Sequence, residues 1–259
     1  PTHRSETNAG VSRHRRIGVG MSGIAYWEAR CSVAEMTRIL RRAYKAVAAE
    51  NERLAAEAGV PVSIRCTTVK PSGTVSLLAG VAPGGHFAMG QFYIRRKRVS
   101  TISPYRAVFD AAGYPWEPAV DGDDTVIYEF PQSQPGVRTQ AQAGMFEQAL
   151  QLCMLQREWS DNAVSFTIEF DPATEGAQLG NLMAQIAPMT KSLSVLPRKH
   201  GYRQPPSEVM TEREYRLRLK MVKRCDWSLY RGGEGSDEPD KYCEAGTCEV
   251  RAKSKEEEK

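Results

Sequence analysis

Hydrophobic side chains recur along this chain with two alternating periods, and this alternation limits the possible folds more than any other feature. Residues 32–58 place apolar side chains every three or four positions and begin with Ser32 and Glu35, spaced as in a capping box, so they predict a long helix. Residues 62–69 instead alternate apolar and polar positions, which predicts a strand whose even-numbered side chains point inward. Helical and strand-like segments continue to alternate up to residue 224, so we expect an α/β fold with largely parallel strands.

The same two periods place the other expected elements. Strands are expected over residues 124–130, 164–170 and 192–196, and helices over residues 139–153, 174–186 and 211–224. Thr139 and Gln142 have the spacing of a capping box at the start of the first of these helices.

Composition narrows the class of protein. Of the 259 residues, 41% are hydrophobic and 25% are charged, which is ordinary for a folded domain and excludes wholesale disorder. No apolar run approaches the roughly 18–20 residues that span a bilayer, and no secretory signal follows Pro1. We therefore expect a cytoplasmic protein without a membrane anchor. The missing initiator methionine suggests a trimmed piece of something longer.

Charge is distributed unevenly along the chain. The net charge is +4, but the segment from Glu234 to the end holds nine acidic and five basic residues, so a tail of −4 follows a body of +8. A basic body with an acidic tail indicates either an anionic small ligand or a tail that docks back onto the body. The alternative is a solvated surface followed by a disordered end.

Four of the six cysteines, Cys31, Cys66, Cys153 and Cys225, are scattered along the chain, and the other two form a close pair. Cys31, Cys66 and Cys153 lie in or beside apolar segments, so we expect small buried side chains in a reducing compartment. Cys243 and Cys248 lie in a polar region that follows a glycine-rich linker, and they cannot belong to a core.

This linker divides the chain into a folded body over residues 1–230 and a flexible tail over residues 231–259. A zinc site at the tail cysteines would need two more ligands nearby, so a reversible dithiol is the better interpretation, with two idle cysteines as the alternative. A flexible tail of about 20 residues reaches roughly 25 Å, far enough to enter a distant cavity.

The first glycine-rich segment, residues 18–23, has the G-x-G-x-x-G spacing of dinucleotide-binding loops. That motif also needs an acidic residue about 20 positions later on a second strand. Glu35 and Glu50 lie in a helical pattern instead, so we discount a dinucleotide site.

The second glycine-containing segment, residues 70–76, follows a predicted strand and is rich in hydroxyl groups. Pro71 would end the strand and Gly73 would permit a tight turn. Backbone N–H groups at such a turn before a helix can hold phosphate. A Ser/Thr-capped turn without a ligand is equally consistent with the residues.

Two other features carry chemistry that could be functional. His86 ends a glycine-rich turn and could donate a proton or bind a metal, although a single loop histidine more often does neither. Arg95–Arg98 is a basic run beside Phe92 and Tyr93, but a solvated or salt-bridged strand end is favoured over a nucleic-acid surface. We expect no direct nucleic-acid binding and assign no metal site.

Several motifs together resemble one enzyme family. Residues 70–86 read KPSGTVSLLAGVAPGGH and are followed by YIRR at 93–96. With RRIGVGMSG at 15–23, WSDNAVS at 159–165 and KSLSVLP at 191–197, they closely resemble the adenosylcobalamin-dependent (class II) ribonucleoside-triphosphate reductases. A C-terminal C-x4-C pair on a flexible tail is similar to that family as well, and the resemblance covers nearly the whole chain.

The resemblance implies a fold and a chemistry. The chain would form part of the ten-stranded α/β barrel of these reductases, with a C-terminal redox tail. Adenosylcobalamin would initiate a thiyl-radical reaction that converts a ribonucleoside triphosphate to a deoxyribonucleotide. Cys243 and Cys248 would re-reduce the active site and would themselves be reduced by a thioredoxin-like protein. The family's substrate phosphate-binding loop matches five positions of this chain: Pro71, Ser72, Gly73, Thr74 and Ser76.

The sequence also departs from the whole family enzyme. The N-P-C-G-E-like loop with the radical cysteine is absent, as are the paired active-site cysteines and the allosteric nucleotide region, all upstream in the family. No residue can be assigned as a cobalamin contact. The resemblance therefore implies a C-terminal part that needs an N-terminal reductase half or chain. The alternative is a non-catalytic phosphate-binding or assembly module with a degenerate reductase fold. The choices of cobalamin over a diiron centre, and of triphosphate over diphosphate substrate, rest on the resemblance alone.

Overall fold

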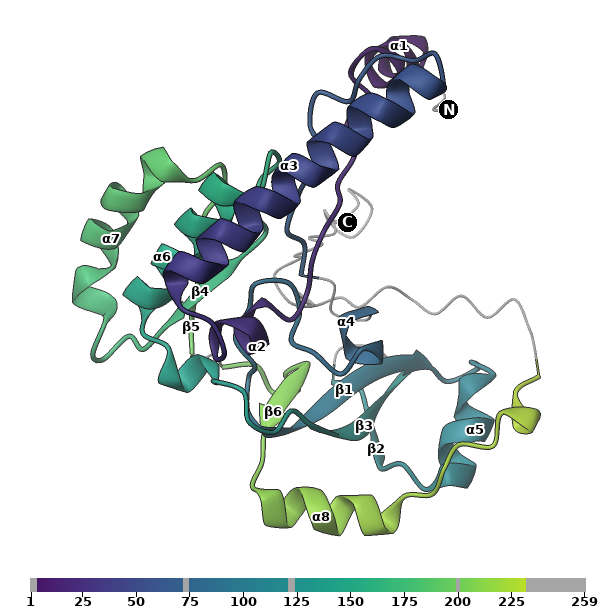
Figure 1. The fold of residues 1–259 in the computed structure, drawn as a ribbon. Helices are drawn as coiled ribbons and strands as arrows, with labels where there is room; N and C mark the ends of the chain where they lie inside the picture. The colour runs from purple at the N-terminus through teal and green to yellow at the C-terminus, as the bar shows by residue number, and fades with distance from the viewer. Residues whose placement is uncertain (1–3, 72–74, 121–123, 199–200, 232–259) are drawn as a thin grey trace, which may run out of the picture. The chain divides into compact units, whose positions relative to one another are not determined.

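The computed structural model describes residues 4–71, 75–120, 124–198 and 201–231 (Figure 1). The chain forms two compact units: unit 1 contains residues 1–88 and 137–199, and unit 2 contains residues 89–136 and 200–259. Among the described residues no helix is long and apolar enough to cross a membrane.

Unit 1 is built from helices and parallel strands. Its helices are α1 (Ser5–His14), α2 (Ile24–Glu28), α3 (Val33–Glu57), α4 (Val75–Leu78), α6 (Met145–Glu158) and α7 (Leu179–Ile186), its 3₁₀ turns are η1 (Gln140–Gln142), η2 (Gly176–Gln178) and η3 (Ala187–Met189), and its strands are β4 (Thr167–Phe170) and β5 (Ser194–Pro197).

A parallel sheet larger than β4 and β5 forms the framework of unit 1. Isolated parallel bridges join Val19 to Thr67 and Val69 to Val164, and β4 pairs in parallel with β5. Four segments therefore follow one another across the sheet: residues 17–19, 65–69, 164–170 and 194–197. Their connections contain α3, α6 and α7, as expected of parallel strands that are joined by crossovers.

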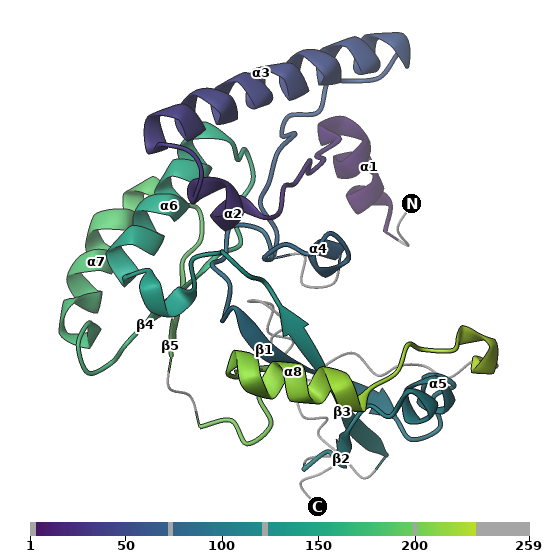
Figure 2. The ribbon, with the colours of Figure 1, turned by 60° about the horizontal axis from the view of Figure 1, so that its bottom comes forward.

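Helices α3, α6 and α7 pack on one face of this sheet (Figures 1 and 2). The side chains at 164, 166, 168 and 170 are all buried against them, and the residues between are more exposed, which confirms the strand predicted over 164–170. The large fully buried residues that these three helices contribute to the core are Met36, Leu40, Met145, Leu152, Leu155 and Leu182.

The predicted helix caps are present. Ser32 Oγ accepts a hydrogen bond from the Glu35 N–H at 3.2 Å, and α3 begins at the next residue, Val33. Thr139 and Gln142 form the expected capping box, but it caps only η1, and Gly144 is the N-cap of α6. The helix predicted over 174–186 corresponds to η2 with α7, and the helix predicted over 211–224 corresponds to α8 (Glu212–Met221).

The strand predicted over residues 62–69 is wrong in its first half. Val62 and Ile64 are exposed, with fractions of 46% and 54%, instead of inward. The Ile64 N–H donates to the carbonyl of His14, so this stretch runs past α1. Only residues 66–69 are buried, because only they have parallel neighbours on both sides.

Unit 2 is an antiparallel sheet with helices. Its strands are β1 (Phe92–Ser100), β2 (Trp116–Pro118), β3 (Thr125–Ser133) and β6 (Ser207–Val209), and its helices are α5 (Tyr105–Ala112), α8 (Glu212–Met221) and the 3₁₀ turn η4 (Trp227–Leu229). The strand order is β2-β3-β1-β6, and all three pairings are antiparallel. The expectation of largely parallel strands therefore holds for unit 1 and is wrong for unit 2.

Successive side chains of β3 lead to different helices. Tyr128 and Phe130 contact Phe109 of α5, whereas Glu129 between them pairs with Arg218 of α8. Because neighbouring strand residues point to opposite faces, α5 and α8 cover opposite faces of this sheet.

Candidate functional site

The G-x-G-x-x-G segment, residues 18–23, and the glycine-rich turn over residues 80–86 meet at the carboxyl ends of parallel segments 17–19 and 65–69. The Gly23 N–H donates to the carbonyl of Ala82 at 2.9 Å, and the Ile24 N–H donates to that of Gly84 at 3.3 Å. The carboxyl ends of parallel strands are where α/β sheets bind ligands. This region of unit 1 is the candidate site.

The predicted phosphate-binding segment lies partly outside the described residues. Ser72, Gly73 and Thr74 are not described. Pro71, on one side of them, is buried, and Ser76, on the other side, is 2% exposed. Because α4 begins at Val75, the three undescribed residues directly precede a helical turn, as the sequence predicted.

Glycine is required where the turn over residues 80–86 approaches Lys70, at the start of the predicted phosphate-binding segment. Gly84 has φ +50°, and a Cβ there would lie 2.4 Å from the backbone oxygen of Lys70. At Gly85 a Cβ would lie 2.9 Å from Leu155 of the core. The turn over residues 80–86 is thus pressed against the start of the predicted phosphate-binding segment.

The glycines of the G-x-G-x-x-G motif serve the same close packing. A Cβ at Gly18 would lie 2.9 Å from Thr68 Cγ2, and a Cβ at Gly23, which has φ +76°, would lie 3.0 Å from Val81 Cβ. The motif therefore lets its segment approach residue 68 and the turn at residue 81.

His86 is a structural residue of the sheet. Its ring stacks on Phe166 with centroids 4.9 Å apart, Nδ1 lies 3.2 Å from the Pro83 carbonyl, and Nε2 accepts the Thr167 N–H at 3.1 Å. This arrangement places the proton on Nδ1, and burial lowers the pKa of the imidazole to about 4. Both nitrogens are occupied, so the proton-donor and metal-ligand hypotheses for His86 are wrong.

Gln148 has a similar role two residues further along β4. Its amide accepts the Glu169 N–H at 2.9 Å and donates to the Glu169 carbonyl at 2.8 Å. The segment over residues 65–69 does not extend beside the whole of β4. His86 and Gln148 supply the hydrogen-bond partners for the backbone groups of Thr167 and Glu169 that it leaves unpaired. Sequence patterns missed Gln148, since a polar residue on a helix gives no sign of burial.

The WSDNAVS motif joins the first three segments of the sheet. Trp159 Nε1 donates to the Thr68 carbonyl at 2.9 Å, and the Thr67 hydroxyl donates to the Trp159 carbonyl. The Asn162 amide donates to the carbonyls of Ile17 and Thr67 at 3.1 and 2.8 Å. The residues of this motif therefore hold neighbouring segments of the sheet together by hydrogen bonds to backbone groups.

Asp161 is the charged member of this motif. Its carboxylate accepts the Cys66 N–H at 2.8 Å and the Tyr44 hydroxyl at 2.9 Å, so it joins α3 to the sheet. Asp161→Ala is expected to destabilise the chain by about 2–4 kcal/mol, because two polar groups lose their acceptor. Asp161→Asn keeps one acceptor oxygen and should cost about half as much. Urea unfolding measures both changes in unfolding free energy. A loss below about 0.5 kcal/mol for Asp161→Ala would mean that Asp161 does not stabilise the contact between α3 and the sheet.

The face of the sheet away from the helices is polar. Thr167 Oγ1 and Ser194 Oγ lie 3.5 Å apart on neighbouring strands. Further along, burial raises the pKa of the Glu169 carboxyl to about 7, while the guanidinium of Arg198 and the Gln140 amide oppose this rise. Glu169 alternates with core residues along β4, so its position facing away from the core was visible in the sequence, but its burial was not.

Glu169 predicts a pH dependence of stability. Its folded-state pKa is about 7 and its ordinary value is near 4.5, so between these values the folded chain holds a proton that the unfolded chain has lost. Wild-type stability should therefore fall relative to Glu169→Gln as the pH rises from 4.5 to 7. Urea unfolding at several pH values measures this. Glu158→Gln is the control. Because Arg41 lowers the pKa of Glu158, the stability difference between wild type and Glu158→Gln should stay constant over that pH range. A constant difference between wild type and Glu169→Gln would contradict the raised pKa.

Glu28 is a second carboxyl that the sequence analysis missed. Burial and the neighbouring Glu147 raise its pKa to about 7, against the opposing effect of Arg138. Arg138 pairs with Glu147 and lies over the ring of Phe87, 5.6 Å from its centroid. Glu28 belongs to a five-residue helix, which is too short for periodicity to show which side is buried.

Two cysteines of the body, Cys66 and Cys153, lie in environments that disfavour the thiolate. Burial raises the thiol pKa of Cys66 and of Cys153, and no disulfide joins the four cysteines that the structure describes. Cys243 and Cys248 lie outside the described residues. Within residues 4–71, 75–120, 124–198 and 201–231, no three His, Cys, Asp or Glu side chains are grouped to hold a metal.

The basic run Arg95–Arg98 belongs to β1, an inner strand of the unit 2 sheet, and is not at a strand end. Arg96 is 12% exposed and contacts Glu129 at 3.0 Å and Glu208 at 2.7 Å. Glu129 also binds Arg218 at 2.7 Å. The salt-bridged alternative of the sequence analysis therefore describes Arg96, and its charge is used within the sheet.

Comparison with known proteins identifies relatives. A probable adenosylcobalamin-dependent ribonucleoside-triphosphate reductase of Dictyostelium discoideum is 34% identical over 254 residues, which cover 96% of this chain and 34% of that protein. The adenosylcobalamin-dependent ribonucleoside-triphosphate reductase of Euglena gracilis is 37% identical over 227 residues, 86% of this chain and 31% of that protein. No protein-family model matches the chain.

A solved structure has the same fold. The crystal structure of a B12-dependent (class II) ribonucleotide reductase matches with a TM-score of 0.78 and 30% identity, over 89% of this chain and 36% of that one. The fold is therefore the α/β fold of part of a class II ribonucleotide reductase. In sequence the chain is homologous to the adenosylcobalamin-dependent ribonucleoside-triphosphate reductases, and it spans about a third of the length of the relatives it matches.

Proposed function

We propose that this chain is the C-terminal part of an adenosylcobalamin-dependent ribonucleoside-triphosphate reductase and acts in the reduction of ribonucleoside triphosphates to deoxyribonucleotides. The observation that carries this proposal is homology to such reductases over up to 96% of the chain. The order of the parallel segments supports it. Among the described residues no further strand pairs with the outer segments, residues 17–19 and 194–197, and such edges can be completed by other strands. An N-terminal reductase half or chain would supply those strands and the radical cysteine, and without it this chain would be inactive.

The contribution of unit 1 would be to hold the substrate's phosphates. Ser72, Gly73, Thr74 and Ser76 would present hydroxyls and backbone N–H groups at the start of α4, with Pro71 ending the preceding segment. The close packing of Gly84 on Lys70 supports this role, because it would fix the start of the loop. A loop fixed in this way loses less entropy when a ligand binds.

The contribution of the tail would be to supply electrons. Cys243 and Cys248 would reduce the active-site disulfide that each turnover leaves, become a disulfide themselves, and be reduced by the dithiol of a thioredoxin-like protein. The raised thiol pKa values of Cys66 and Cys153 favour the tail pair over the body cysteines in this exchange. These reactions would take place in the cytoplasm.

The cofactor of the whole enzyme would be adenosylcobalamin, as the names of the relatives imply. His86 does not fit as a ligand of its cobalt ion, since it uses both ring nitrogens within unit 1. We assign no residue of this chain to the cofactor and no step to its chemistry.

Co-expression with the N-terminal part of a related reductase tests the proposal. We expect a stable complex on size-exclusion chromatography that forms deoxyribonucleotide only when adenosylcobalamin is added. A complex without activity would favour the alternative, a non-catalytic phosphate-binding or assembly module. Failure of the two chains to associate would contradict the proposal, provided that this chain alone is folded by circular dichroism.

A further inference from the structure

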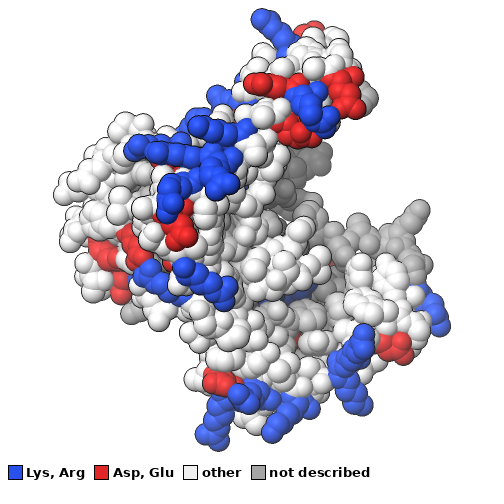
Figure 3. Space-filling view, in the orientation of Figure 1, with Lys and Arg blue, Asp and Glu red and all other residues white. Residues whose placement is uncertain are grey.

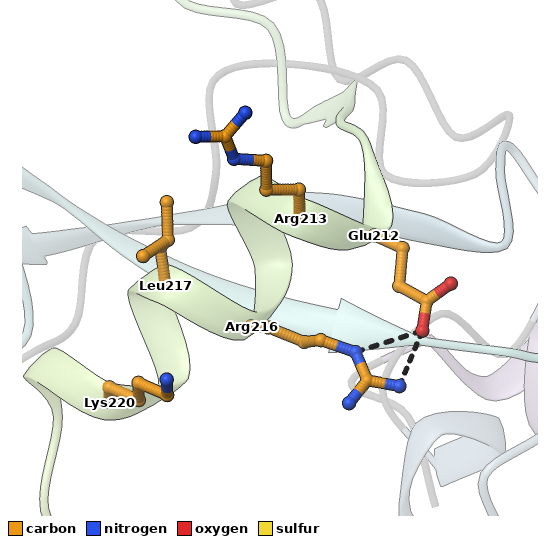
Figure 4. A pocket seen from close by; sticks show the side chains of 5 residues that line it. All are labelled: Glu212, Arg213, Arg216, Leu217 and Lys220. Carbon is orange, nitrogen blue, oxygen red and sulfur yellow. Dashed lines mark hydrogen bonds and ion pairs between the residues drawn. The ribbon is translucent and has the colours of Figure 1, made fainter.

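The outer surface of α8 in unit 2 carries positively charged side chains that do not help to hold the helix on the sheet. Figure 3 shows Lys and Arg side chains gathered over this helix. An open pocket of about 420 Å³ runs along it, and its lining residues, shown in Figure 4, are Glu212, Arg213, Arg216, Leu217 and Lys220. Their spacing of three and four residues places the three cations on neighbouring turns beside one apolar side chain.

Other residues hold α8 on the sheet. Tyr215 packs on Phe92 with ring centroids 5.1 Å apart, and Arg218 binds Glu129. The N-terminus is capped by Thr211 and Glu214. The cations of the pocket are therefore not needed to attach the helix.

Among the described residues, two of the pocket cations have no acidic partner. Arg216 pairs with Glu212 at 2.6 Å. No ion pair joins Arg213 or Lys220 to any residue of the described part of the chain. Leu217 is 52% exposed, so this surface combines unpaired positive charge with uncovered apolar area.

The chain itself contains a segment that matches this surface. Glu234, Asp237, Glu238 and Asp240 are four acidic residues within seven positions that contain no basic residue. The segment begins three residues after Arg231, where the described part ends. The described part ends on the α5 side of the sheet, where Tyr230 packs on Tyr105 with ring centroids 5.0 Å apart. The C-terminal ends of α8 and α5 adjoin at one edge, since the Lys223 N–H donates to the Ala112 carbonyl at 2.8 Å. The nine residues from Arg231 to Asp240 span at most about 30 Å when extended, and the segment would meet α8 by passing this edge.

We propose that the acidic segment Glu234–Asp240 docks on the pocket surface of α8, where its carboxylates pair with Arg213 and Lys220. Exposed ion pairs are individually weak and are screened by salt, so this contact is reversible. Docking holds Cys243 and Cys248 beside unit 2, and release returns them to solution. The contact does not depend on the proposed redox role of these cysteines. If they have that role, release allows them to reach the active site.

The test is a measurement of backbone motion in the complete ¹⁵N-labelled chain by NMR relaxation. In about 0.02 M salt the amides of Ser236 to Glu238 should be restrained, and in about 0.5 M salt their order parameters should fall below about 0.6. The double variant Arg213→Gln/Lys220→Gln should give the low values in both salts. The matched control is Arg38→Gln/Arg42→Gln, two exposed cations of α3 in unit 1, and it should behave as wild type.

A reciprocal variant keeps the test independent of changes in α8. Replacing the four acidic residues by Asn and Gln should shift the amide resonances of α8 and leave those of α3 unchanged. The proposal is overturned if Ser236 to Glu238 are equally mobile in wild type and in the α8 variant in low salt, or if they stay restrained in that variant. Binding of a separate acidic partner to α8 while the tail stays mobile would also overturn it. None of these outcomes bears on whether the completed enzyme reduces nucleotides.

Discussion

Cys248→Ser is expected to stop multiple turnover of the completed reductase with a thioredoxin system while sparing the first turnover. With one thiol left, Cys243 can form a mixed disulfide with the active site but cannot release it, because release needs the second thiol of the pair. A rapid-quench assay should therefore show a burst of about one product per active site and no steady-state rate. The prediction rests on the proposed function.

Two controls separate loss of electron transfer from loss of folding. Dithiothreitol, a small dithiol, should restore steady-state turnover to Cys248→Ser because it can reduce the active site directly. Cys225→Ser changes the half-buried cysteine that precedes the tail and should leave turnover with thioredoxin unchanged. Full steady-state activity of Cys248→Ser with thioredoxin would remove the tail pair from the reaction.

Gly84→Ala is expected to cost the chain about 3 kcal/mol or more of unfolding free energy. A left-handed backbone costs a non-glycine residue roughly 1–2 kcal/mol. The new Cβ would also lie 2.4 Å from the Lys70 oxygen, and that oxygen belongs to the backbone and cannot rotate away. The shift of Lys70 needed to relieve this contact would displace the phosphate-binding segment, so the KM for nucleotide should rise as well.

Gly80→Ala isolates the contribution of this contact. Gly80 has φ +67°, but a Cβ there meets nothing within 4 Å, so only the conformational cost of about 1–2 kcal/mol is expected. Urea unfolding of the two variants measures the difference. Equal losses would mean that the turn over residues 80–86 moves freely from Lys70, and the fixed-loop argument would fail.

Elements with local signals were predictable from the sequence. The start of α3 follows from Ser32 and Glu35, whose hydrogen bond forms as the capping box requires. β4 follows from strict alternation over residues 164–170, because one face of it is buried by helices. Such signals depend on neighbours in sequence, and they survive in any tertiary context that buries the same face.

The remaining errors concern pairing partners, which are distant in sequence. Val62 and Ile64 alternate as a strand would, but no segment pairs with them, so they stay exposed. β1 and β3 of unit 2 pair in an antiparallel sheet, although the alternation of helices and strands indicated parallel strands. His86 has the residue type of a catalytic group, and only the position of the Thr167 N–H shows that it completes a strand. The phosphate-binding positions 72–74 and the tail cysteines remain predictions.

The division of unit 1 into two stretches of chain also sets an order of events during synthesis. Thr67 and Asn162, which join the second and third segments of its sheet, are 95 residues apart, and most of the unit 2 sheet lies between them. Contacts of such high sequence separation form late and slow folding. A ribosome that has completed β1 and β3 has thus produced two antiparallel strands that can pair at once. At that point α6, against which α3 packs, has not been synthesised. During that interval the apolar side of α3 is uncovered, and chaperones would have their main opportunity to bind the nascent chain.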